Sequence, residues 1–534
     1  MKYLPLFFLV AATPVALSQD FDVLILNGKV IDGTGNSWRY ADIGVKEGKI
    51  ALIGNLKVFS AHHIIDASNR VVAPGFIDVH THIEGNDLKF PGATNFIMDG
   101  VTTVVTGNCG SSNTDMAKYR SRLDSVKTSV NVASLIGHNS VRRAVMGDTQ
   151  RDPTAEEQTR MEALVEQAML NGAVGLSTGL IYIPGTYSKT PEVIGLAKAA
   201  SRYNGVYASH IRDEGDEVKE AIEEAINIGR QAAIPVEISH FKVTYKPNWG
   251  KSVNTLAQVD EARKNGIDVT IDQYPYVASS TTLSTTVPSW AFSGGNDSLL
   301  MRLSNAGTRA KIKNEMVSIL KGKQLKTYSY AVVARFGADT TLNGKNISEI
   351  NKLKGRKSKP AEEAETILEM VEQGSAQMVF FSMEEGDLRR IMQYPYNMFA
   401  SDAGIARFGS GVPHPRSYGT NARVLGTYVR DLKIIGLEEA VRRMTSLPAQ
   451  KFNIKDRGLL KEGMAADIVV FDAATVADKS TFTQPHAYSQ GFDYVLVNGK
   501  ITVDRGRHTG IRNGVFVKGP GWSNWVVKAP VVAE

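Results

Sequence analysis

The sequence predicts an α/β protein: a TIM-type (β/α)8 barrel with a β-sandwich formed from both chain ends and an inserted subdomain between strands 7 and 8. Three observations support this prediction. Apolar strand-like runs alternate with helical stretches from about residue 74. Short β-branched runs separated by turn dipeptides occupy both ends of the chain. More than 100 residues, about 274–397, separate the seventh and eighth runs, too many for one crossover helix.

Residues 1–18 have the features of a signal peptide. Lys2 provides a positive start, Leu4 to Ala12 is apolar, and Ala16-Leu17-Ser18 is a small-residue cleavage site. The apolar run is too short to span a bilayer stably, and no other stretch reaches that length. We therefore expect cleavage before Gln19, export to a bacterial periplasm or medium, and no membrane contact afterwards.

Composition and charge argue against nucleic acid as a partner. The 534 residues are 43% hydrophobic and 22% charged, which is ordinary for a globular protein. The net charge of +6 comes from scattered Lys and Arg, with no basic block of the kind that binds nucleic acid. A small molecule, with a mild preference for anions, is the expected partner. The oligomeric state is left open.

The two chain ends are predicted to pair in one β-sandwich, from residues 19–73 and 451–534. Asn27-Gly28 and Glu47-Gly48 interrupt the N-terminal β-branched runs and indicate hairpins. The sequence Val497-Asn-Gly-Lys500 near the other end is similar to Leu26-Asn-Gly-Lys29.

Residues 74–450 are assigned to the barrel, whose active site is expected at the C-terminal ends of its strands. Among the helices between strands, Thr154–Leu170 has a typical start, with a Glu at position 157. An insertion at about 285–395, with a strand at Tyr328–Arg335 and a helix at Ala361–Gln373, is expected to act as a substrate lid. The eight predicted strands are Gly75–His80, Thr102–Gly107, Val132–Gly137, Ala173–Ser177, Gly205–His210, Pro235–His240, Ile267–Gln273 and Met398–Ser401.

Side chains that bind metals follow five of these strands. Their imidazole, thiol and carboxylate groups suit Zn²⁺ best. His80 and His82, two residues apart, leave a strand on the same side. The predicted metal ligands are His80, His82, Cys109, His210, His240 and Asp402.

A zinc site of this kind indicates hydrolysis. A zinc ion with an open position lowers the pKa of a bound water towards neutrality. Asp402 is the predicted catalytic residue. It would accept a proton from the bound water and pass it to the leaving amine. Cys109, the single cysteine of the chain, then serves as a ligand and not as half of a disulfide.

Several motifs together resemble the D-aminoacylase (N-acyl-D-amino-acid deacylase) family of the amidohydrolase superfamily, over nearly the whole mature chain. They are Pro-Gly-Phe-Ile-Asp-Val-His80-Thr-His82, Gly-Asn-Cys109-Gly, Ser-His210-Ile-Arg-Asp-Glu, Ser-His240-Phe-Lys242, Asp-Gln-Tyr274-Pro-Tyr and Ser-Asp402-Ala-Gly. The resemblance implies one zinc held by Cys109, His210 and His240. It implies a second, weaker site at His80, His82 and Asp402.

The resemblance also implies that Cys109 takes the place of the carboxylated lysine that bridges metals in many relatives. In hydantoinase-like and dihydroorotase-like enzymes that lysine is expected near the end of strand four. Here the strand end reads Leu176-Ser-Thr-Gly179, without a lysine. This difference favours a deacylase over a cyclic-amide hydrolase.

The same resemblance implies a clamp for the α-carboxylate of the substrate, with one tyrosine near the acyl carbonyl. A guanidinium can bind a carboxylate through two hydrogen bonds, and a lysine adds charge. A carboxylate fixed in this way lets the pocket select the D form. The implied clamp residues are Lys242, Tyr274, Ser280 and Arg416, with Tyr182 near the carbonyl.

We interpret the sequence as a zinc-dependent enzyme that hydrolyses N-acyl-D-amino acids, or dipeptides with a C-terminal D-residue. A cyclic-amide hydrolase of the same superfamily and a non-catalytic metal-binding barrel are the alternatives. The sequence leaves open the preferred side chain, one metal or two, and whether His138 lines the site or is structural.

Overall fold

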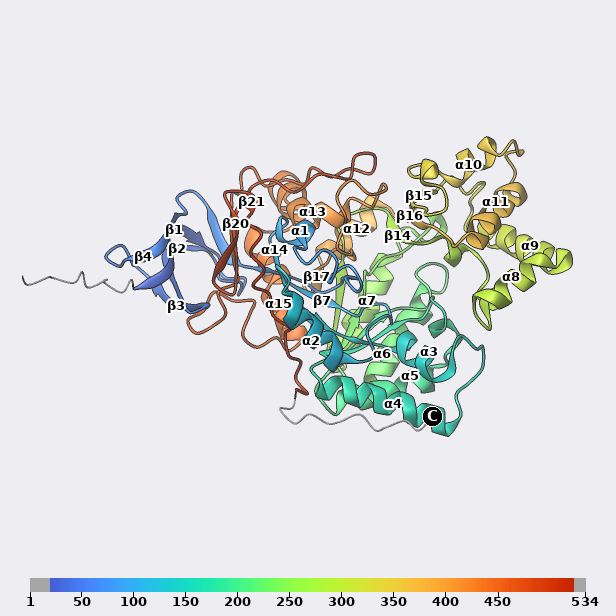
Figure 1. The fold of residues 1–534 in the computed structure, drawn as a ribbon, viewed down its shortest axis with the longest axis horizontal. Helices are drawn as coiled ribbons and strands as arrows, with labels where there is room; N and C mark the ends of the chain where they lie inside the picture. The colour runs from blue at the N-terminus through green and yellow to red at the C-terminus, as the bar shows by residue number, and fades with distance from the viewer. Residues whose placement is uncertain (1–19, 523–534) are drawn as a thin grey trace, which may run out of the picture.

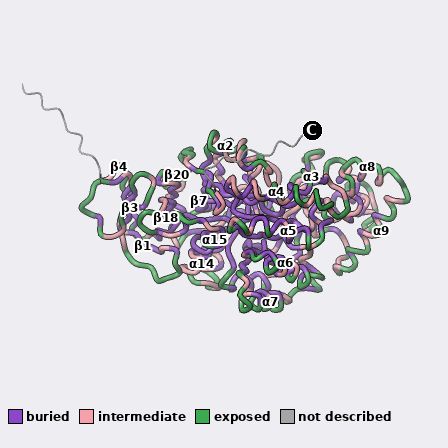
Figure 2. The backbone as a smooth tube through the Cα atoms, turned by 90° about the horizontal axis from the view of Figure 1, so that it is seen from below, coloured by how far each residue is buried: buried purple, intermediate pink, exposed green. Residues whose placement is uncertain are grey.

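The computed structural model describes residues 20–522. The predicted signal peptide at 1–18 lies outside the described residues. Three parts follow one another along the long axis of the molecule: a β region, a central barrel, and an α/β insertion at the opposite end (Figure 1). Buried residues are concentrated in the central part (Figure 2).

The barrel has the eight strands that the sequence predicts, counted within residues 20–522, and all neighbouring pairs are parallel. A parallel bridge between Thr81 and Ala403 joins the first strand end to the last. The strands are β6 (Phe76–Asp78), β7 (Val101–Thr106), β8 (Asn131–Ser134) continued by β9 (Ile136–Gly137), β10 (Gly175–Gly179), β11 (Val206–His210), β12 (Val236–Ile238), β13 (Val269–Gln273) and β17 (Asn397–Phe399).

Helices between the strands cover the barrel and share one apolar core with its strands. Thr154 accepts from the Glu157 backbone N–H and Glu157 accepts from that of Thr154, so the predicted start of α4 is a capping box. The helices are α1 (Thr94–Ile97), α2 (Met116–Val126), α3 (His138–Met146), α4 (Ala155–Leu170), α5 (Thr190–Ser201), α6 (Val218–Ala232), α7 (Ser252–Lys264), α12 (Glu385–Met392), α13 (Arg416–Arg423), the π-helix η6 (Val424–Asp431), α14 (Leu437–Met444) and α15 (Ser446–Lys451).

Strands from both chain ends pair with each other, as predicted, and they do so within one continuous sheet, because β5 pairs antiparallel with β18. This sheet encloses its own apolar core, which includes Val23, Ile43 and Leu496. Its described strands are β1 (Phe21–Val30), β2 (Arg39–Lys46), β3 (Lys49–Gly54), β4 (Ala61–Asp66), β5 (Val71–Pro74), β18 (Ile468–Phe471), β19 (Phe492–Val497), β20 (Lys500–Asp504) and β21 (Arg507–His508).

The predicted hairpin at Asn27-Gly28 is wrong. Strand β1 continues through this dipeptide and shifts register against β2 there, so it is a bulge. A type I′ hairpin turn needs φ above zero at both central residues. Asn27 has φ 60°, but Gly28 does not lie in the left-handed region. At Asn498-Gly499 both values are positive, 47° and 77°, and β19 does turn into β20.

The insertion after β13 has a three-stranded sheet and a separate apolar core, which includes Leu299, Ile367 and Met378. The predicted strand and helix are found here as β15 and α11. The elements are β14 (Ser279–Thr282), η3 (Leu283–Thr286), η4 (Ser289–Phe292), α8 (Asn296–Ser304), α9 (Ala306–Gly322), β15 (Ala331–Arg335), η5 (Thr340–Leu342), α10 (Ile347–Leu353), α11 (Pro360–Glu372) and β16 (Gln377–Phe380).

A polar network joins the β region to the N-terminal end of the barrel. The buried carboxylate of Asp467 accepts from Asn131 Nδ2 on β8 at 2.9 Å and from the Asn498 backbone N–H at 2.7 Å. It also pairs with Arg457. The last described segment continues this contact, because Phe516 bridges to Val132.

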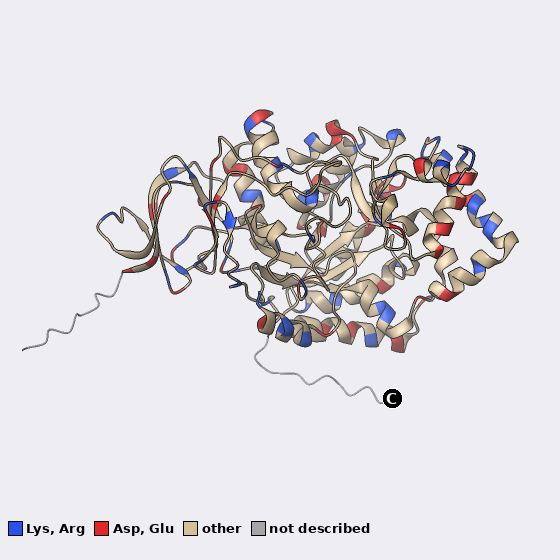
Figure 3. Cartoon of the chain, turned by 45° about the horizontal axis from the view of Figure 1, so that its top comes forward, with Lys and Arg blue, Asp and Glu red and all other residues tan. Residues whose placement is uncertain are grey.

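The surface carries both signs of charge, with Lys and Arg interspersed among Asp and Glu (Figure 3). Among residues 20–522, no helix combines the length and the apolar character needed to cross a membrane.

Candidate active site

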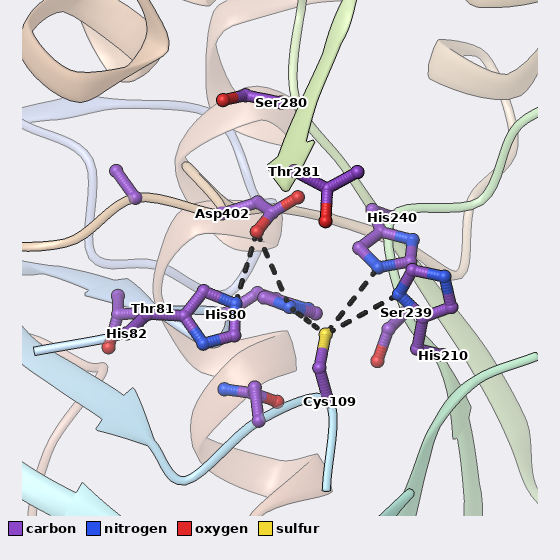
Figure 4. A network of polar contacts seen from close by, with 12 residues as sticks. His80, Thr81, His82, Cys109, His210, Ser239, His240, Ser280, Thr281 and Asp402 are labelled. Carbon is purple, nitrogen blue, oxygen red and sulfur yellow. Dashed lines mark hydrogen bonds and ion pairs between the residues drawn. The ribbon is translucent and has the colours of Figure 1, made fainter. Parts of the chain in front are cut away.

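The predicted metal ligands meet at the C-terminal face of the barrel, where Cys109, His210 and His240 point toward one another (Figure 4). The turn after β7 carries Cys109, β11 ends at His210, and His240 follows β12. Because neighbouring parallel strands end at one edge, residues distant in sequence converge there. Apart from His82, these side chains are buried or nearly so.

The distances around Cys109 fit a zinc site. Its Sγ lies 3.5 Å from His210 Nδ1, 3.7 Å from His240 Nε2 and 3.3 Å from His80 Nε2. Tetrahedral zinc, with Zn–S of about 2.3 Å and Zn–N of about 2.0–2.1 Å, separates a sulfur and a nitrogen ligand by about 3.5 Å. The thiol and imidazole groups can therefore hold Zn²⁺ with little movement.

His80, Cys109 and His240 form one group whose ligand atoms lie within 4.8 Å of one another, and two further groups of this kind overlap it. In the first, Asp402 Oδ1 lies 3.2 Å from His82 Nε2 and 3.7 Å from His80 Nε2. The second contains His210, His240 and Glu214. The first group matches the second site implied by the sequence, whereas the place of Glu214 in the other was not predicted.

Three of these residues have left-handed backbones: Cys109 at φ 51°, His240 at φ 37° and Asp402 at φ 51°. Each such conformation costs a non-glycine residue about 1–3 kcal/mol and persists only where the surroundings impose it. Strained backbone at the ends of three strands is typical of a functional site. It directs these side chains into the site, whereas an extended backbone would direct them away from it.

Charge in the site favours the ionised forms of the acid and the thiol. Burial alone would raise the pKa of Cys109, but His80 and the hydrogen bond with His210 outweigh it and hold that pKa well below its ordinary value. Burial would likewise raise the pKa of Asp402, but the Arg416 guanidinium and His80 hold it well below the usual range. A thiolate and a carboxylate are the forms that bind a divalent metal.

Two carboxylates that sequence reasoning missed, the buried Asp272 and the partly buried Glu214, orient the imidazoles. Asp272 lies 3.2 Å from His80 Nδ1 and accepts from the His240 backbone N–H at 2.8 Å. Glu214 lies 3.0 Å from His240 Nδ1. Partners of this kind fix the ring orientation of metal-binding histidines. Their signal was present in the quoted motifs, because Glu214 follows His210 by four residues and Asp272 is the last residue but one of β13.

The end of β10 explains the missing lysine. A Cβ atom on Gly179 would lie 2.2 Å from the carbonyl oxygen of Cys109. Ser177 accepts from the Gly110 backbone N–H at 3.0 Å. The turn that carries the thiol therefore occupies the space where a strand-four side chain would extend into the site.

The predicted substrate residues divide into two sets. Tyr182, Ser280 and Arg416 line a cavity of about 850 Å³ that also exposes Cys109 and Asp402. Lys242 and Tyr274 are buried behind it.

Arg416, predicted as part of the carboxylate clamp, lies beside a carboxylate and an aromatic ring of the protein itself. Its Nη1 lies 2.9 Å from Asp402 Oδ2, and its guanidinium lies 4.6 Å from the centre of the Tyr274 ring. The other members have protein partners. Lys242 Nζ lies 2.6 Å from Glu214 Oε1, and the Ser280 hydroxyl donates to the Met378 carbonyl at 2.7 Å.

Tyr182 and Asn139 form the wall beside His210. The Tyr182 ring lies 4.8 Å from the His210 ring, and its hydroxyl lies 3.0 Å from Thr281 Oγ1. Asn139, a residue not predicted, donates to the Tyr182 carbonyl at 3.2 Å. His138 faces the other way, with Nε2 2.8 Å from buried Glu192, so it supports α3 and does not line the cavity.

A cavity at the C-terminal face of a parallel barrel, lined by thiol, imidazole and carboxylate ligands, defines a metal-dependent hydrolase of the barrel class. The sequence profile described as "Amidohydrolase family" matches residues 63–503. The chain belongs to this family. It is 38% identical to a D-aminoacylase of Alcaligenes xylosoxydans xylosoxydans, over 90% of this chain and 94% of that protein.

An N-acyl-D-glutamate deacylase of the same organism is 36% identical, over 90% of this chain and 94% of that protein. A crystal structure of N-acyl-D-glutamate deacylase from Bordetella bronchiseptica, complexed with zinc and a phosphonate inhibitor, superposes with a TM-score of 0.80. It is 35% identical and covers 93% of this chain and 100% of that one.

A D-hydantoinase structure, at 16% identity and a TM-score of 0.55, shares the fold alone. The predicted resemblance to D-aminoacylases and the predicted barrel are thus confirmed, and the cyclic-amide alternative loses its support.

Proposed function

We propose that this protein hydrolyses the amide bond of N-acyl-D-amino acids, or of dipeptides with a C-terminal D-residue, with zinc as cofactor. One observation carries the proposal: the arginine suited to an α-carboxylate contacts the predicted proton acceptor, Arg416 to Asp402 at 2.9 Å, beside the thiol and imidazole ligands. The similarity to D-aminoacylase and to N-acyl-D-glutamate deacylase supports the same substrate class.

The distances from Cys109 Sγ to His210 Nδ1 and His240 Nε2 support these three residues as the ligands of the principal zinc. The group of His80, His82 and Asp402 supports the second, weaker site. A zinc ion in this site would polarise an amide carbonyl and lower the pKa of water. Cys109 contributes negative charge, and Asp272 and Glu214 hold the imidazoles in position.

The chain's own residues then bind the substrate and move the proton. Arg416 binds the α-carboxylate and so sets the amide beside Asp402, because the two side chains are in contact. Asp402 accepts a proton from the attacking water and returns it to the amine nitrogen. Tyr182, whose ring packs beside that of His210, would border the acyl carbonyl.

Selection of the D form follows from two fixed points. With the α-carboxylate held by Arg416 and the carbonyl held between Tyr182 and the metal ligands, only two arrangements of the remaining Cα substituents are possible. Ser280 to Thr282 line the cavity at the base of the insertion, and we propose that this wall closes one of the two arrangements.

We also propose that the protein is exported, on the basis of the signal-peptide features of residues 1–18. Compounds with D-residues released from peptidoglycan would then be available to it. The insertion, on the strands β14 to β16 that border the cavity, is proposed as a lid over bound substrate.

The first experiment measures zinc content and hydrolysis of N-acetyl-D-methionine and N-acetyl-L-methionine on the same preparation. We expect about one or two zinc per chain and release of free amino acid from the D substrate only. Turnover of only the L substrate would refute the proposal. Bound zinc without turnover of either substrate would support the metal centre but exclude these simple substrates.

A further inference from the structure

The mouth of the active-site cavity carries cations without acidic partners. Lys89, Arg335 and Arg407 line the cavity and are exposed. Within residues 20–522 none of the three makes an ion pair. The other two cations of the cavity wall are paired, Arg416 with Asp402 and Arg143 with Asp148.

The balance of charge in the cavity is one-sided. Among its described lining residues Asp402 is the only acid, and it is paired with Arg416. A concave surface lined by one sign of charge concentrates ligands of the opposite sign. The three unpaired cations, which we call the cationic rim, therefore provide positive charge beyond what one α-carboxylate needs.

The residues of the rim come from three elements that line one cavity and are joined to one another. Lys89 lies in the loop after β6, Arg407 in the loop after β17, and Arg335 at the end of β15. Asn86 Nδ2 donates to the Ile405 carbonyl at 3.0 Å and joins the first two loops. The Val412 backbone N–H donates to the Ala334 carbonyl at 2.7 Å and joins the second loop to β15.

The loop that carries Arg407 is also anchored from behind. His486 Nδ1 accepts from the Gly409 backbone N–H at 3.2 Å, and its Nε2 lies 2.9 Å from the Gly411 carbonyl. The Phe408 ring packs on the rings of His486 and Tyr488 at 5.4 and 5.1 Å. The rim is therefore built on a fixed backbone, which reduces the entropy lost on binding.

The cavity is larger than an N-acetyl amino acid requires. Its volume of about 850 Å³ lies near the upper end of the range of about 300–1,000 Å³ that holds drug-sized ligands. Space for a longer substrate and unpaired positive charge occur in the same cavity.

We infer that the preferred substrate carries a second anionic group besides its α-carboxylate, and that Lys89, Arg335 and Arg407 bind this group. The inference rests on the proposed function for the site itself and adds the substrate class. A side-chain carboxylate of the D-residue and a carboxylate on the acyl group are the two sources with this chemistry.

Matched substrate pairs test the inference on the zinc-loaded protein. N-acetyl-D-glutamate against N-acetyl-D-glutamine tests the side-chain source. N-succinyl-D-methionine against its terminal amide tests the acyl source. We expect kcat/KM for the charged member of one pair to exceed that of its neutral partner about tenfold, since exposed ion pairs are individually weak. The excess should shrink at high salt.

The combined variant Lys89→Gln, Arg335→Gln, Arg407→Gln should bring this ratio close to one. Lys264→Gln, an exposed lysine on α7 that does not line the cavity, should leave the ratio unchanged. Equal rates within both pairs, or a charged preference that survives in the triple variant, would overturn the inference.

A binding measurement separates this inference from the proposed function. Titration calorimetry with succinate and with succinamate needs no turnover. Succinate should bind about tenfold more tightly than succinamate, and the triple variant should lose the difference. If every D substrate is inert but succinate still binds more tightly than succinamate, the proposed function fails while the cationic rim is retained as an anion-binding site. If succinate and succinamate bind equally, the inference about the rim is refuted.

Discussion

Asp402 shows how one side chain joins two parts of the site. Its carboxylate contacts His82 on one oxygen and Arg416 on the other. The same residue therefore lies between the metal ligands and the arginine proposed to bind substrate. Its backbone N–H donates to the His80 carbonyl at 2.9 Å, which holds it there through the closure of the barrel.

Asp402→Asn should abolish most turnover while the principal zinc stays bound, because Cys109, His210 and His240 are untouched. Loss of a general base lowers kcat by about 10²- to 10⁴-fold. Zinc content and kcat are measured on one preparation, with Asp124→Asn on exposed α2 as the control. A variant that keeps near-normal kcat would remove Asp402 from the mechanism.

Glu214→Gln should weaken zinc binding. Glu214 contacts both His240 Nδ1 and Lys242 Nζ, and loss of its charge leaves the lysine beside an imidazole without a balancing acid. Loss of a carboxylate that orients a metal-binding histidine typically lowers metal affinity about 10- to 100-fold. Competition with a chelator measures the affinity. Glu217→Gln, exposed three residues later, is the matched control, and an equal loss there would contradict the assignment.

The site residues that could be predicted are those that follow strands. His80, Cys109 and Asp402 each stand just after a strand, a position visible in the sequence. The direction of a side chain is not visible in this way. Lys242 contacts Glu214, 28 positions away in the sequence, and the Ser280 hydroxyl contacts the backbone of β16, 98 positions away. Partners so distant in the sequence set the direction of these two side chains.

At the scale of elements, the eight barrel strands were predictable because apolar runs and helical stretches alternate. The turn at Asn27-Gly28 was not, although the same dipeptide at 498–499 does form a hairpin. At 27–28 the pairing with β2 continues, and Asp42 accepts from the Asn27 backbone N–H at 2.7 Å. Partners outside the dipeptide decided between bulge and turn.

A buried lysine in α15 makes stability depend on pH. Burial lowers the pKa of Lys451 to about 8, although Asp268 beside its Nζ opposes the shift. Between this value and its ordinary pKa the unfolded lysine holds a proton that the folded one has lost. The free energy of unfolding contributed by Lys451 therefore rises with pH in that window.

Lys451→Met should remove this dependence. Relative to the variant, the wild-type protein should gain about 2 kcal/mol of unfolding free energy between pH 7 and 10. Denaturant unfolding at both pH values gives the difference. Lys455 is exposed four residues later, and Lys455→Met should show the same pH dependence of unfolding free energy as the wild type. If Lys451→Met also showed that dependence, the folded pKa of Lys451 would lie near its ordinary value.

At the scale of the whole molecule, the sequence indicated that the chain ends come together but not how they attach to the barrel. The attachment depends on polar contacts between residues hundreds of positions apart, such as Asn131 with Asp467 and Asn498. No local pattern marks such contacts. The place of Phe516 beside β8 was unpredictable for the same reason.

Asp467→Ala should destabilise this junction. It leaves the buried Arg457 guanidinium without its buried partner, a change that typically costs about 3–5 kcal/mol. Asp456→Ala is a sharp control, because Asp456 is the other acid near Arg457, at 3.5 Å, but is 63% exposed. Urea unfolding should show a large loss for the first variant and almost none for the second, and similar losses would contradict the role of the junction.

The pairing of β5 with β18 can form only late in biosynthesis. Val71 pairs with Phe471, so about 400 residues leave the ribosome between the two partners. At about 5–20 residues per second this takes about 20–80 s. Throughout that interval the edge of β5 has no partner strand, and an unpaired edge is open to other chains. A nascent chain of this protein therefore has a long aggregation-sensitive period that its finished fold does not reveal.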